Sequence, residues 1–427
     1  MVTRLVARLQ DILYVRFTDH FASFPAHVLA SISPPNPLKR LVKTLGYSVV
    51  RLLGNVFRPI RTPENLHGAV WLYVVSQNNY ESLQFIRESR PDTVLVAGQQ
   101  KEIGRYNKLV NRLSLRRKLL YYWQLPIVFW GLYKREGKRA WRFFDLIFNA
   151  IGYYEVYVRT LHHYRPRAII FANDHNDDAR ALLLAARACG IPTAYVQHAS
   201  VSTNFPPLGF DLSLLEGQDA LDKYRQCGPI RGRVELVGMP KADAFLTQRN
   251  LNQHVAHVGI ACNILDDTDA IAVVVEYLLR EFPALTFTFR PHPSDRRDFV
   301  FLRAHPQLLV SDARRENIFE FLLKQDALIA ADTSTHLEAT LLNVASLYYR
   351  FNPHGVAEDY YGYVAHGLVD QAHTLPDLAA LLRKYQAYKP LDHYHRAAYY
   401  NATLGTPDEG YSQRRALSIV QAWLPLV

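Results

Sequence analysis

The chain has 427 residues, 49% of them hydrophobic and 21% charged, which is enough apolar sequence for two cores rather than one. This composition excludes a disordered or low-complexity protein. The net charge of +10 is uneven, because residues 1–61 carry nine Lys/Arg against two Asp and residues 101–140 carry eleven against two Glu. The sequence therefore predicts local basic patches on an otherwise acidic protein.

Cysteine use and the N-terminal segment indicate the compartment. The three cysteines have no metal-ligand spacing, and their odd number argues against a disulfide framework: Cys189, Cys227 and Cys262. Arg4, Arg8 and Asp11 interrupt the first apolar run, so no secretory signal is expected. No stretch approaches the ~20 apolar residues that span a bilayer. We therefore expect a cytoplasmic protein.

Two basic amphipathic segments begin the chain. Residues 1–17 fit a helix with one apolar face, a proline-rich break covers 31–40, and a second such segment follows. Either both helices pack on the body, or one lies on an anionic membrane surface. Residues 105–163 are predicted to be helical, basic and aromatic. Because no nucleic-acid-binding motif accompanies them, we expect a membrane- or acceptor-facing insertion and no nucleic acid.

From residue 68 onward, short apolar runs alternate with helical patterns, which predicts parallel sheets covered by helices. The polar stretch 246–253 reads as a linker between two such sets. We therefore predict an α/β protein with two Rossmann-like domains facing across a cleft. The N-terminal domain spans 1–245, the nucleotide-binding domain spans 246–385, and helices in 386–427 are expected to pack back on the first domain.

The run Leu285–Phe289 reads as a buried strand that ends in Arg290-Pro291-His292-Pro293. Proline fixes φ and restricts the residue before it, so His292 is held rigidly at the carboxyl end of the strand. Ligands of open α/β sheets bind at that edge. We predict that Arg290, His292 and Pro293 belong to a phosphate grip, with His292 stabilising a leaving phosphate. The alternative is an exposed turn histidine.

A second phosphate-binding candidate follows the strand Asp326–Ala331. The sequence Asp332-Thr333-Ser334-Thr335 opens a helix, and Thr335 with Glu338 has the spacing of a capping box. Main-chain N–H groups at a helix start and nearby hydroxyls attract phosphate. Thr333, Ser334 and Thr335 are therefore donor-binding candidates, as is Lys241 in the other half. An ordinary helix cap is the alternative.

Acidic and imidazole groups follow other predicted strands. Asp174, His175 and Asp267 are the candidates for a base that deprotonates an acceptor hydroxyl. Asn78, Asn79 and His198 occupy further strand ends and are predicted to bind the acceptor. Adjacent residues such as Asp-His-Asn-Asp-Asp at 174–178 rarely converge on one ion, so no metal is expected. Neither a dinucleotide fingerprint nor a P-loop follows any strand, so both of those nucleotide sites are disfavoured.

These motifs resemble a known group of enzymes. Phe289 to Pro293 on a late strand, followed about forty residues later by Asp332 to Thr335, is similar to bacterial glycosyltransferases of the GT-B fold that use CMP-activated sugars. Sialyltransferases, Kdo transferases and related CDP-glycerol polymerases share a His-Pro motif and a Ser/Thr pair, matched here by His292-Pro293 and Ser334-Thr335. The resemblance covers roughly residues 165–350. Asp266-Asp267-Thr268 lacks the glycine of the acidic motif that carries the base in many sialyltransferases.

The resemblance implies transfer of a sialic-acid-like or Kdo-like sugar from its CMP ester to a glycan in capsule, lipopolysaccharide or other surface polysaccharide synthesis. The CMP-sugar would be the donor substrate, and neither a cofactor nor a metal ion is expected. The basic first half would dock on the inner face of the bacterial inner membrane, where lipid-linked acceptors reside. Two alternatives remain open: a CDP-glycerol or CDP-polyol phosphotransferase, and a non-catalytic membrane-associated scaffold that keeps the GT-B shell.

Overall fold

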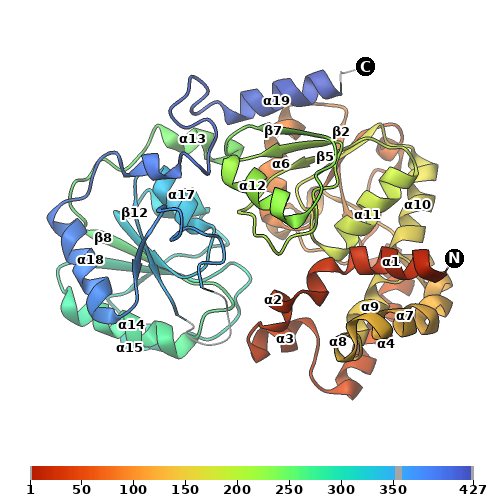
Figure 1. Ribbon diagram of the computed structural model, residues 1–427, viewed down its shortest axis with the longest axis horizontal. Coiled ribbons are helices and arrows are strands. Elements are labelled where there is room, and N and C mark those ends of the chain that lie inside the picture. The colour runs from red at the N-terminus through yellow and green to blue at the C-terminus, as the bar shows by residue number, and fades with distance from the viewer. Residues whose placement is uncertain (1, 352–357, 425–427) are drawn as a thin grey trace.

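The computed structural model describes residues 2–351 and 358–424 and shows two α/β lobes side by side (Figure 1). Each lobe is built on its own parallel sheet, and each sheet is covered by helices on both faces. The predicted fold class, two Rossmann-like domains in the GT-B arrangement, is confirmed.

The N-terminal lobe contains a sheet of seven strands in the order β3-β2-β1-β4-β5-β6-β7. All neighbouring pairs in this sheet are parallel. The central strands β1 and β4 are made of apolar and aromatic residues and are fully buried, as expected for a parallel sheet covered on both faces. The strands are β1 Val70–Tyr73, β2 Thr93–Gly98, β3 Asn111–Leu113, β4 Ala168–Phe171, β5 Thr193–Val196, β6 Leu212–Leu215 and β7 Arg233–Leu236.

Helices of the N-terminal lobe fall into three sets. The helices between the strands are α6 Gln77–Ser89, α10 Tyr153–Tyr164, α11 Asp177–Ala188 and α12 Gln218–Cys227. The helices before β1 are α1 Val2–Ile12, η1 Tyr14–Phe17, α2 Asp19–Ala22, α3 Ala26–Ile32, α4 Pro37–Leu52, α5 Gly54–Phe57 and η2 Pro63–Leu66. The insertion between β2 and β4 contains η3 Gly104–Leu109, η4 Arg116–Gln124, α7 Leu125–Glu136, α8 Lys138–Arg142 and α9 Phe144–Ala150.

The C-terminal lobe has six parallel strands in the order β10-β9-β8-β11-β12-β13. They are β8 His257–Ala261, β9 Thr286–Arg290, β10 Leu309–Val310, β11 Ala327–Ala330, β12 Ala345–Tyr349 and β13 Asp370–Ala372. Their helices are α14 Thr268–Glu281, α15 Phe301–Ala304, α16 Ile318–Leu322, α17 Thr335–Leu341 and α18 Leu375–Ala387. In this order, β8 separates β9 from β11, the two strands that precede the predicted phosphate contacts.

Two connections join the lobes. The first runs from β7 through η5 Pro240–Ala242 and α13 Asp243–Leu246. The second contains η6 His393–Ala397 and α19 Ser412–Trp423, which crosses back to the N-terminal lobe (Figure 1). Ala416 and Val420 of α19 join the core of that lobe. Of the predicted tail helices, α19 thus returns to the first domain, whereas η6 packs against α17 of the C-terminal lobe, and residues 425–427 lie outside the described ones.

Two short strands, β3 and β13, are not predicted from the sequence. β3 lies inside the segment 105–163 that is predicted to be helical, and β13 follows β12 without a preceding sequence signal. Both are three-residue edge strands, too short for an alternating pattern to distinguish them from loops. Across residues 2–351 and 358–424, no helix is both long and apolar enough to cross a bilayer.

We expect Gly217→Ala to destabilise the protein by about 1–3 kcal/mol, because the tail crosses directly over Gly217. A Cβ placed on Gly217 would lie 2.3 Å from the carbonyl carbon of Tyr400, so one backbone would have to move away from the other. Urea unfolding measures the loss. Gly46→Ala in α4 is the control, because a Cβ there meets nothing within 4 Å and alanine favours a helix. Equal stability of the two variants would contradict this packing.

Candidate functional site

The carboxyl ends of the two sheets face each other and are joined by polar contacts. Lys223 Nζ donates to the carbonyl of Tyr361 at 2.7 Å, and the hydroxyls of Ser200 and Tyr363 are hydrogen-bonded. His20 of α2 stacks on Tyr360 with ring centroids 4.1 Å apart. The N-terminal helices therefore take part in the junction between the lobes, as Figure 1 also shows for α2 and α3.

His292 follows β9 at this junction, as predicted. Its side chain is exposed, yet the surrounding protein atoms desolvate it enough to lower its pKa. The main-chain N–H of Ser294 donates to Nδ1 at 3.1 Å, so the ring proton of the neutral imidazole belongs on Nε2. His292 therefore offers an Nε2–H donor without being protonated.

The loop that carries His292 is braced against the loop after β8. Arg297 forms an ion pair with Asp295 at 2.6 Å and donates to the carbonyl of Asn263 at 2.8 Å. The same guanidinium donates to the carbonyl of Asp266. This bracing, together with the prolines on either side, holds the imidazole in a fixed position before any ligand arrives.

Ser334 and Thr335 open α17 after β11. Ser334 is in helical conformation and its hydroxyl makes no capping bond. The predicted capping box between Thr335 and Glu338 is wrong, because the Glu338 carboxylate forms an ion pair with Lys241 instead. Thr333 bonds within the turn, through a 3.1 Å contact between its hydroxyl and that of Thr335. The Ser334 hydroxyl is thus spared from helix capping.

His292 and Ser334 lie at the same edge of one sheet. β9 and β11 are each parallel to β8, which lies between them. Two strand spacings separate their strands by about 10 Å, so a ligand of phosphate size with a short extension can reach both. The order of the strands places both residues at one edge, and their contact with a single phosphate stays a prediction.

Arg290 has a structural role in place of the phosphate contact predicted for it. Its side chain is buried, and it donates to the Ser311 hydroxyl at 2.5 Å and to the Glu316 carbonyl at 2.9 Å. The guanidinium also lies over the ring of Phe321. These contacts fix the end of β9 from inside the lobe, while Pro293 stays exposed beside His292.

Asp174 and His175 form an oriented pair after β4. The Asp174 carboxylate accepts from His175 Nδ1 at 2.9 Å and from the Tyr224 hydroxyl at 2.6 Å. Burial acts to raise the pKa of Asp174, but these hydrogen bonds outweigh it and the pKa is lowered. An ionised carboxylate that takes the Nδ1 proton leaves His175 Nε2 as a free base. The structure thus favours His175 among the three predicted bases, with Asp174 positioning it.

Asp267, the third candidate base, caps a helix instead. It is the N-cap of α14, and its carboxylate accepts from the main-chain N–H groups of Asp269 and Ala270 at 2.9 and 3.0 Å. Its neighbour Asp266 is buried, and this burial raises the pKa of Asp266 to about 7. Burial thus disfavours the ionised form of Asp266, and the Asp267 carboxylate, although exposed, is engaged by the main-chain N–H groups that open α14.

The three predicted acceptor residues differ in their surroundings. Asn79 is buried and joins two strand ends, accepting from Val75 N and donating to the Ala172 carbonyl. Asn78 donates to the carbonyl of His198 at 3.0 Å. Burial lowers the pKa of His198 to about 3, and in the described part of the chain its Nδ1 has no hydrogen-bond partner. An unpaired buried nitrogen is costly, so His198 suits a ligand contact better than Asn79 does.

Lys241 links the lobes rather than reaching a donor. Its ammonium lies 2.5 Å from the Glu338 carboxylate and 3.5 Å from the His198 carbonyl. Burial would lower the pKa of Lys241, but Glu338 and then Glu216 raise it, so the cation is retained. Glu216, at the end of β6, was not predicted, although its position after a buried strand is the same signal that pointed to Asp174.

We expect the stability of the protein to fall as pH rises from about 4.5 towards 8, because burial raises the pKa of Glu216 to about 8. The folded state keeps this proton over a range in which the unfolded chain has lost it, so the stabilisation is complete at the acidic end. Glu216→Gln removes the titration and should flatten that decline by a few kcal/mol at most. Chemical unfolding at a series of pH values tests this, and an unchanged slope in the variant would contradict it.

The acidic residues of the segment 174–178 diverge from one another. Asp177 pairs with Arg16 at 3.3 Å, and Asp178 accepts from the Tyr73 hydroxyl at 2.8 Å. Among residues 2–351 and 358–424, no group of three or more His, Cys, Asp or Glu side chains is placed to hold a metal ion. Metal independence stays a prediction.

Solved structures share this architecture at low sequence identity. A UDP-N-acetylglucosamine 2-epimerase from Listeria monocytogenes, so far assigned provisionally, superposes with a TM-score of 0.52 at 11% identity, covering 84% of this chain and 98% of its own. A variant of the wall teichoic acid polymerase TagF, soaked with CDPG, superposes with a TM-score of 0.52 at 11% identity, covering 91% of this chain and 98% of its own.

A third structure, the Methanocaldococcus jannaschii UDP-GlcNAc 2-epimerase in complex with UDP-GlcNAc and UDP, superposes with a TM-score of 0.50 at 12% identity, over 83% of this chain and 100% of its own. No protein-family model and no curated protein sequence matches the chain. At these identities, the similarity establishes the two-lobed fold alone.

Proposed function

We propose that the protein is a glycosyltransferase that takes its sugar from a nucleotide-activated donor, whose phosphate lies between His292 and Ser334. The observation that carries this proposal is the pair of donor groups at one sheet edge, after β9 and β11. The likeness to structures that hold UDP-GlcNAc or CDPG supports a nucleotide-bound ligand in the same kind of cleft. The position also matches the general rule for ligands of open α/β sheets.

The Nε2–H of His292 donates to a non-bridging phosphate oxygen, and the Ser334 hydroxyl donates to another. Both contacts strengthen as the bond between the sugar and the phosphate breaks and negative charge builds up on the phosphate. As the phosphate becomes more negative, it raises the pKa of His292, so the imidazole can take up a proton during departure. The lowered pKa of His292 in the ligand-free protein therefore suits an imidazole that is neutral before the reaction and gains a proton in the transition state.

His175, which lies in the N-terminal lobe opposite the phosphate site, acts as the general base. The acceptor hydroxyl attacks the anomeric carbon, the carbon–oxygen bond to the phosphate breaks, and the hydroxyl proton passes to His175 Nε2. Asp174 stabilises the resulting imidazolium through the 2.9 Å contact to Nδ1. Closure of the lobes brings the two halves of this machinery together and excludes water.

Within this class we favour a cytidine donor, namely a CMP-activated sialic-acid-like or Kdo-like sugar for a surface polysaccharide. The sequence resemblance at His292-Pro293 and Ser334-Thr335 is the support for it. The second candidate, transfer of a polyol phosphate from a CDP-polyol, is supported by the likeness to the CDPG-soaked TagF variant. In that reaction the acceptor oxygen attacks phosphorus and CMP leaves, so the same phosphate contacts serve both.

A thermal-shift screen of CMP, UMP, GDP and ADP tests the donor class. We expect CMP at one hundred times its dissociation constant to stabilise the protein by about 2.7 kcal/mol, with little effect of the other three. Preferential stabilisation by UMP would overturn the cytidine assignment. Incubation with each CMP-sugar or with CDP-glycerol, followed by measurement of released CMP, then separates the two reactions. If none of these donors is consumed while CMP binds, the non-catalytic alternative holds.

A further inference from the structure

The helix α4 packs on the protein with its polar face and exposes its apolar face to solvent. Its polar residues Arg40, Thr44 and Arg51 are buried. Its apolar residues on the opposite stripe, spaced at i, i+3 and i+4, are exposed to solvent: Leu38, Leu41, Val42, Leu45, Val49 and Leu52. An amphipathic helix of a globular protein has the reverse orientation. This stripe is therefore an apolar surface that lacks its partner in the isolated chain.

Specific contacts fix this orientation. Arg51 donates to the carbonyl of Asn149 at 3.1 Å and bonds to the Tyr122 hydroxyl, which ties the end of α4 to the insertion. Lys43 forms an ion pair with the buried carboxylate of Asp145 at 3.1 Å. Turning the apolar stripe inward would break these bonds and remove the cation that pairs with the buried Asp145 carboxylate, at a high desolvation cost. The outward apolar face is thus built into the fold.

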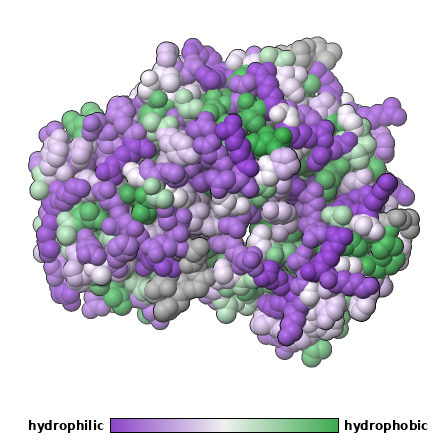
Figure 2. All heavy atoms as spheres, in the orientation of Figure 1, coloured by the Kyte–Doolittle hydropathy of each residue, from purple (hydrophilic) through white to green (hydrophobic). Residues whose placement is uncertain are grey.

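The insertion, parts of which pack against α4, and the chain around α4 itself carry exposed aromatic and basic side chains. Exposed indoles occur at Trp123, Trp130 and Trp141 of the insertion, and Phe57 of α5 is 71% exposed. The stretch 33–61 contains six Lys/Arg and no Asp or Glu. The helices α4, α7, α8 and α9 gather in the lower right of Figure 1, where Figure 2 shows green apolar residues between purple hydrophilic ones.

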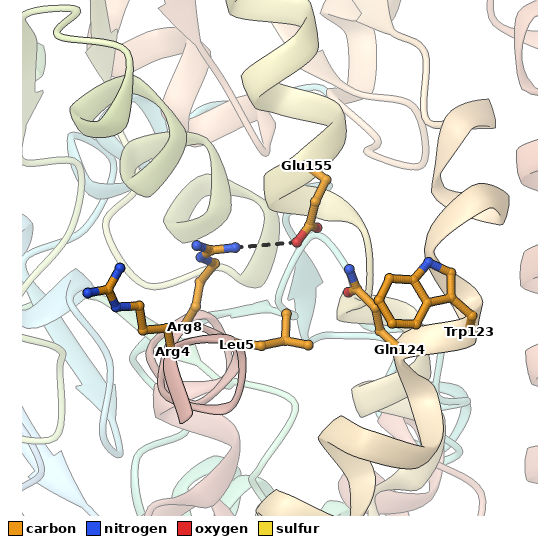
Figure 3. Close-up of a pocket in the computed structure, with 6 residues that line it drawn as sticks. All are labelled: Arg4, Leu5, Arg8, Trp123, Gln124 and Glu155. Atoms are coloured by element: carbon orange, nitrogen blue, oxygen red, sulfur yellow. Dashed lines mark hydrogen bonds and ion pairs between the residues drawn. The ribbon is translucent and has the colours of Figure 1, made fainter. Parts of the chain in front are cut away.

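A pocket of about 450 Å³ adjoins the insertion (Figure 3). Trp123 and Gln124 line one side of it, and Arg4 and Arg8 of α1 line the other. Arg8 is held by Glu155 at 3.3 Å, while Arg4 extends away from that carboxylate. The pocket thus adds cationic groups next to an exposed tryptophan.

We propose that the face formed by α4, α5 and the exposed tryptophans of the insertion docks on a bilayer that contains anionic lipids. Apolar side chains enter the acyl boundary, indoles suit the interface, and Lys and Arg attract the headgroups. A helix of 16 residues, about 24 Å long, lies flat on such a surface. Of the two amphipathic helices, α1 buries Val6, Leu9 and Ile12 in the core, so the membrane-facing role falls to α4.

Co-flotation of the full chain with phosphatidylcholine vesicles, with and without phosphatidylglycerol, tests this surface. We expect binding to the anionic vesicles that weakens with salt, and a fall of about tenfold or more in the double variant Leu45→Glu/Val49→Glu. The matched control is Val273→Glu, which alters a side chain 57% exposed on the other lobe and should bind as the wild type does. Circular dichroism and thermal unfolding confirm that each variant is folded.

Three results would overturn the docking proposal. The first is a wild-type protein that does not bind anionic vesicles. The second is a Leu45→Glu/Val49→Glu variant that binds them as well as the wild type does. The third is a wild-type dimer in light scattering that this variant converts to monomers, without vesicle binding, because a second copy would then cover the stripe. None of these measurements depends on nucleotide or transferase activity.

Discussion

Replacing Lys241 by alanine is expected to lower the free energy of unfolding by about 3–5 kcal/mol, because it removes one partner of a buried ion pair. The Lys241 ammonium lies 2.5 Å from the Glu338 carboxylate of the other lobe. Glu338 and, after it, Glu216 raise the pKa of Lys241. Without the cation, Glu338 would have to hold its charge unpaired at the junction. Urea unfolding at neutral pH measures the loss.

Two control variants isolate the buried charge. Arg303→Ala breaks a contact of similar length, 2.6 Å to Asp298, but both of its side chains are mostly exposed and we expect a cost below about 1 kcal/mol. The double variant Lys241→Met/Glu338→Gln keeps the volume and removes both charges, so it should recover much of the loss. A Lys241→Ala variant as stable as Arg303→Ala would show that the lobes are held together by other contacts.

His292→Ala is expected to weaken binding of the nucleotide by about 10- to 100-fold, the range of one hydrogen bond to a charged group. The reason is the Nε2–H donor that the Ser294 contact to Nδ1 leaves facing the ligand. Isothermal titration with CMP measures the change. Because the side chain is exposed, the fold should be retained.

The chain supplies its own control for this variant in a second His-Pro pair, His305-Pro306. His305 follows α15, away from the carboxyl end of β9, so His305→Ala should bind CMP as the wild type does. Equal loss in the two variants would point to a general effect of imidazole charge. Unchanged affinity in both would remove His292 from the site.

The sequence predicts the parts of this fold that depend on local pattern. Short apolar runs bounded by turn residues, such as those of β4 and β11, predict buried strands, and the parallel arrangement of the strands places His175, His292 and Ser334 at carboxyl ends. Long-range contacts could not be foreseen. The Ser311 and Glu316 contacts that bury Arg290 come from segments 21 and 26 residues away, and the partner of Lys241 comes from the other lobe.

The apolar pattern of α4 is a second case in which the sequence predicts the element but not its contacts. Its spacing predicts an amphipathic helix, but a pattern cannot say which face meets the protein. That orientation depends on Arg51 and Lys43 finding Asn149 and Asp145, about a hundred residues further on. Likewise the choice among Asp174, His175 and Asp267 needed the hydrogen bonds that make one carboxylate a positioning group and another a helix cap.

A crystal structure of the protein with CMP tests the shared phosphate site most directly. The account predicts phosphate oxygens about 3 Å from both His292 Nε2 and the Ser334 hydroxyl, at the edge formed by β9, β8 and β11. A phosphate bound at the edge of the other sheet, near His175, or a nucleotide that touches neither His292 nor Ser334, would contradict it.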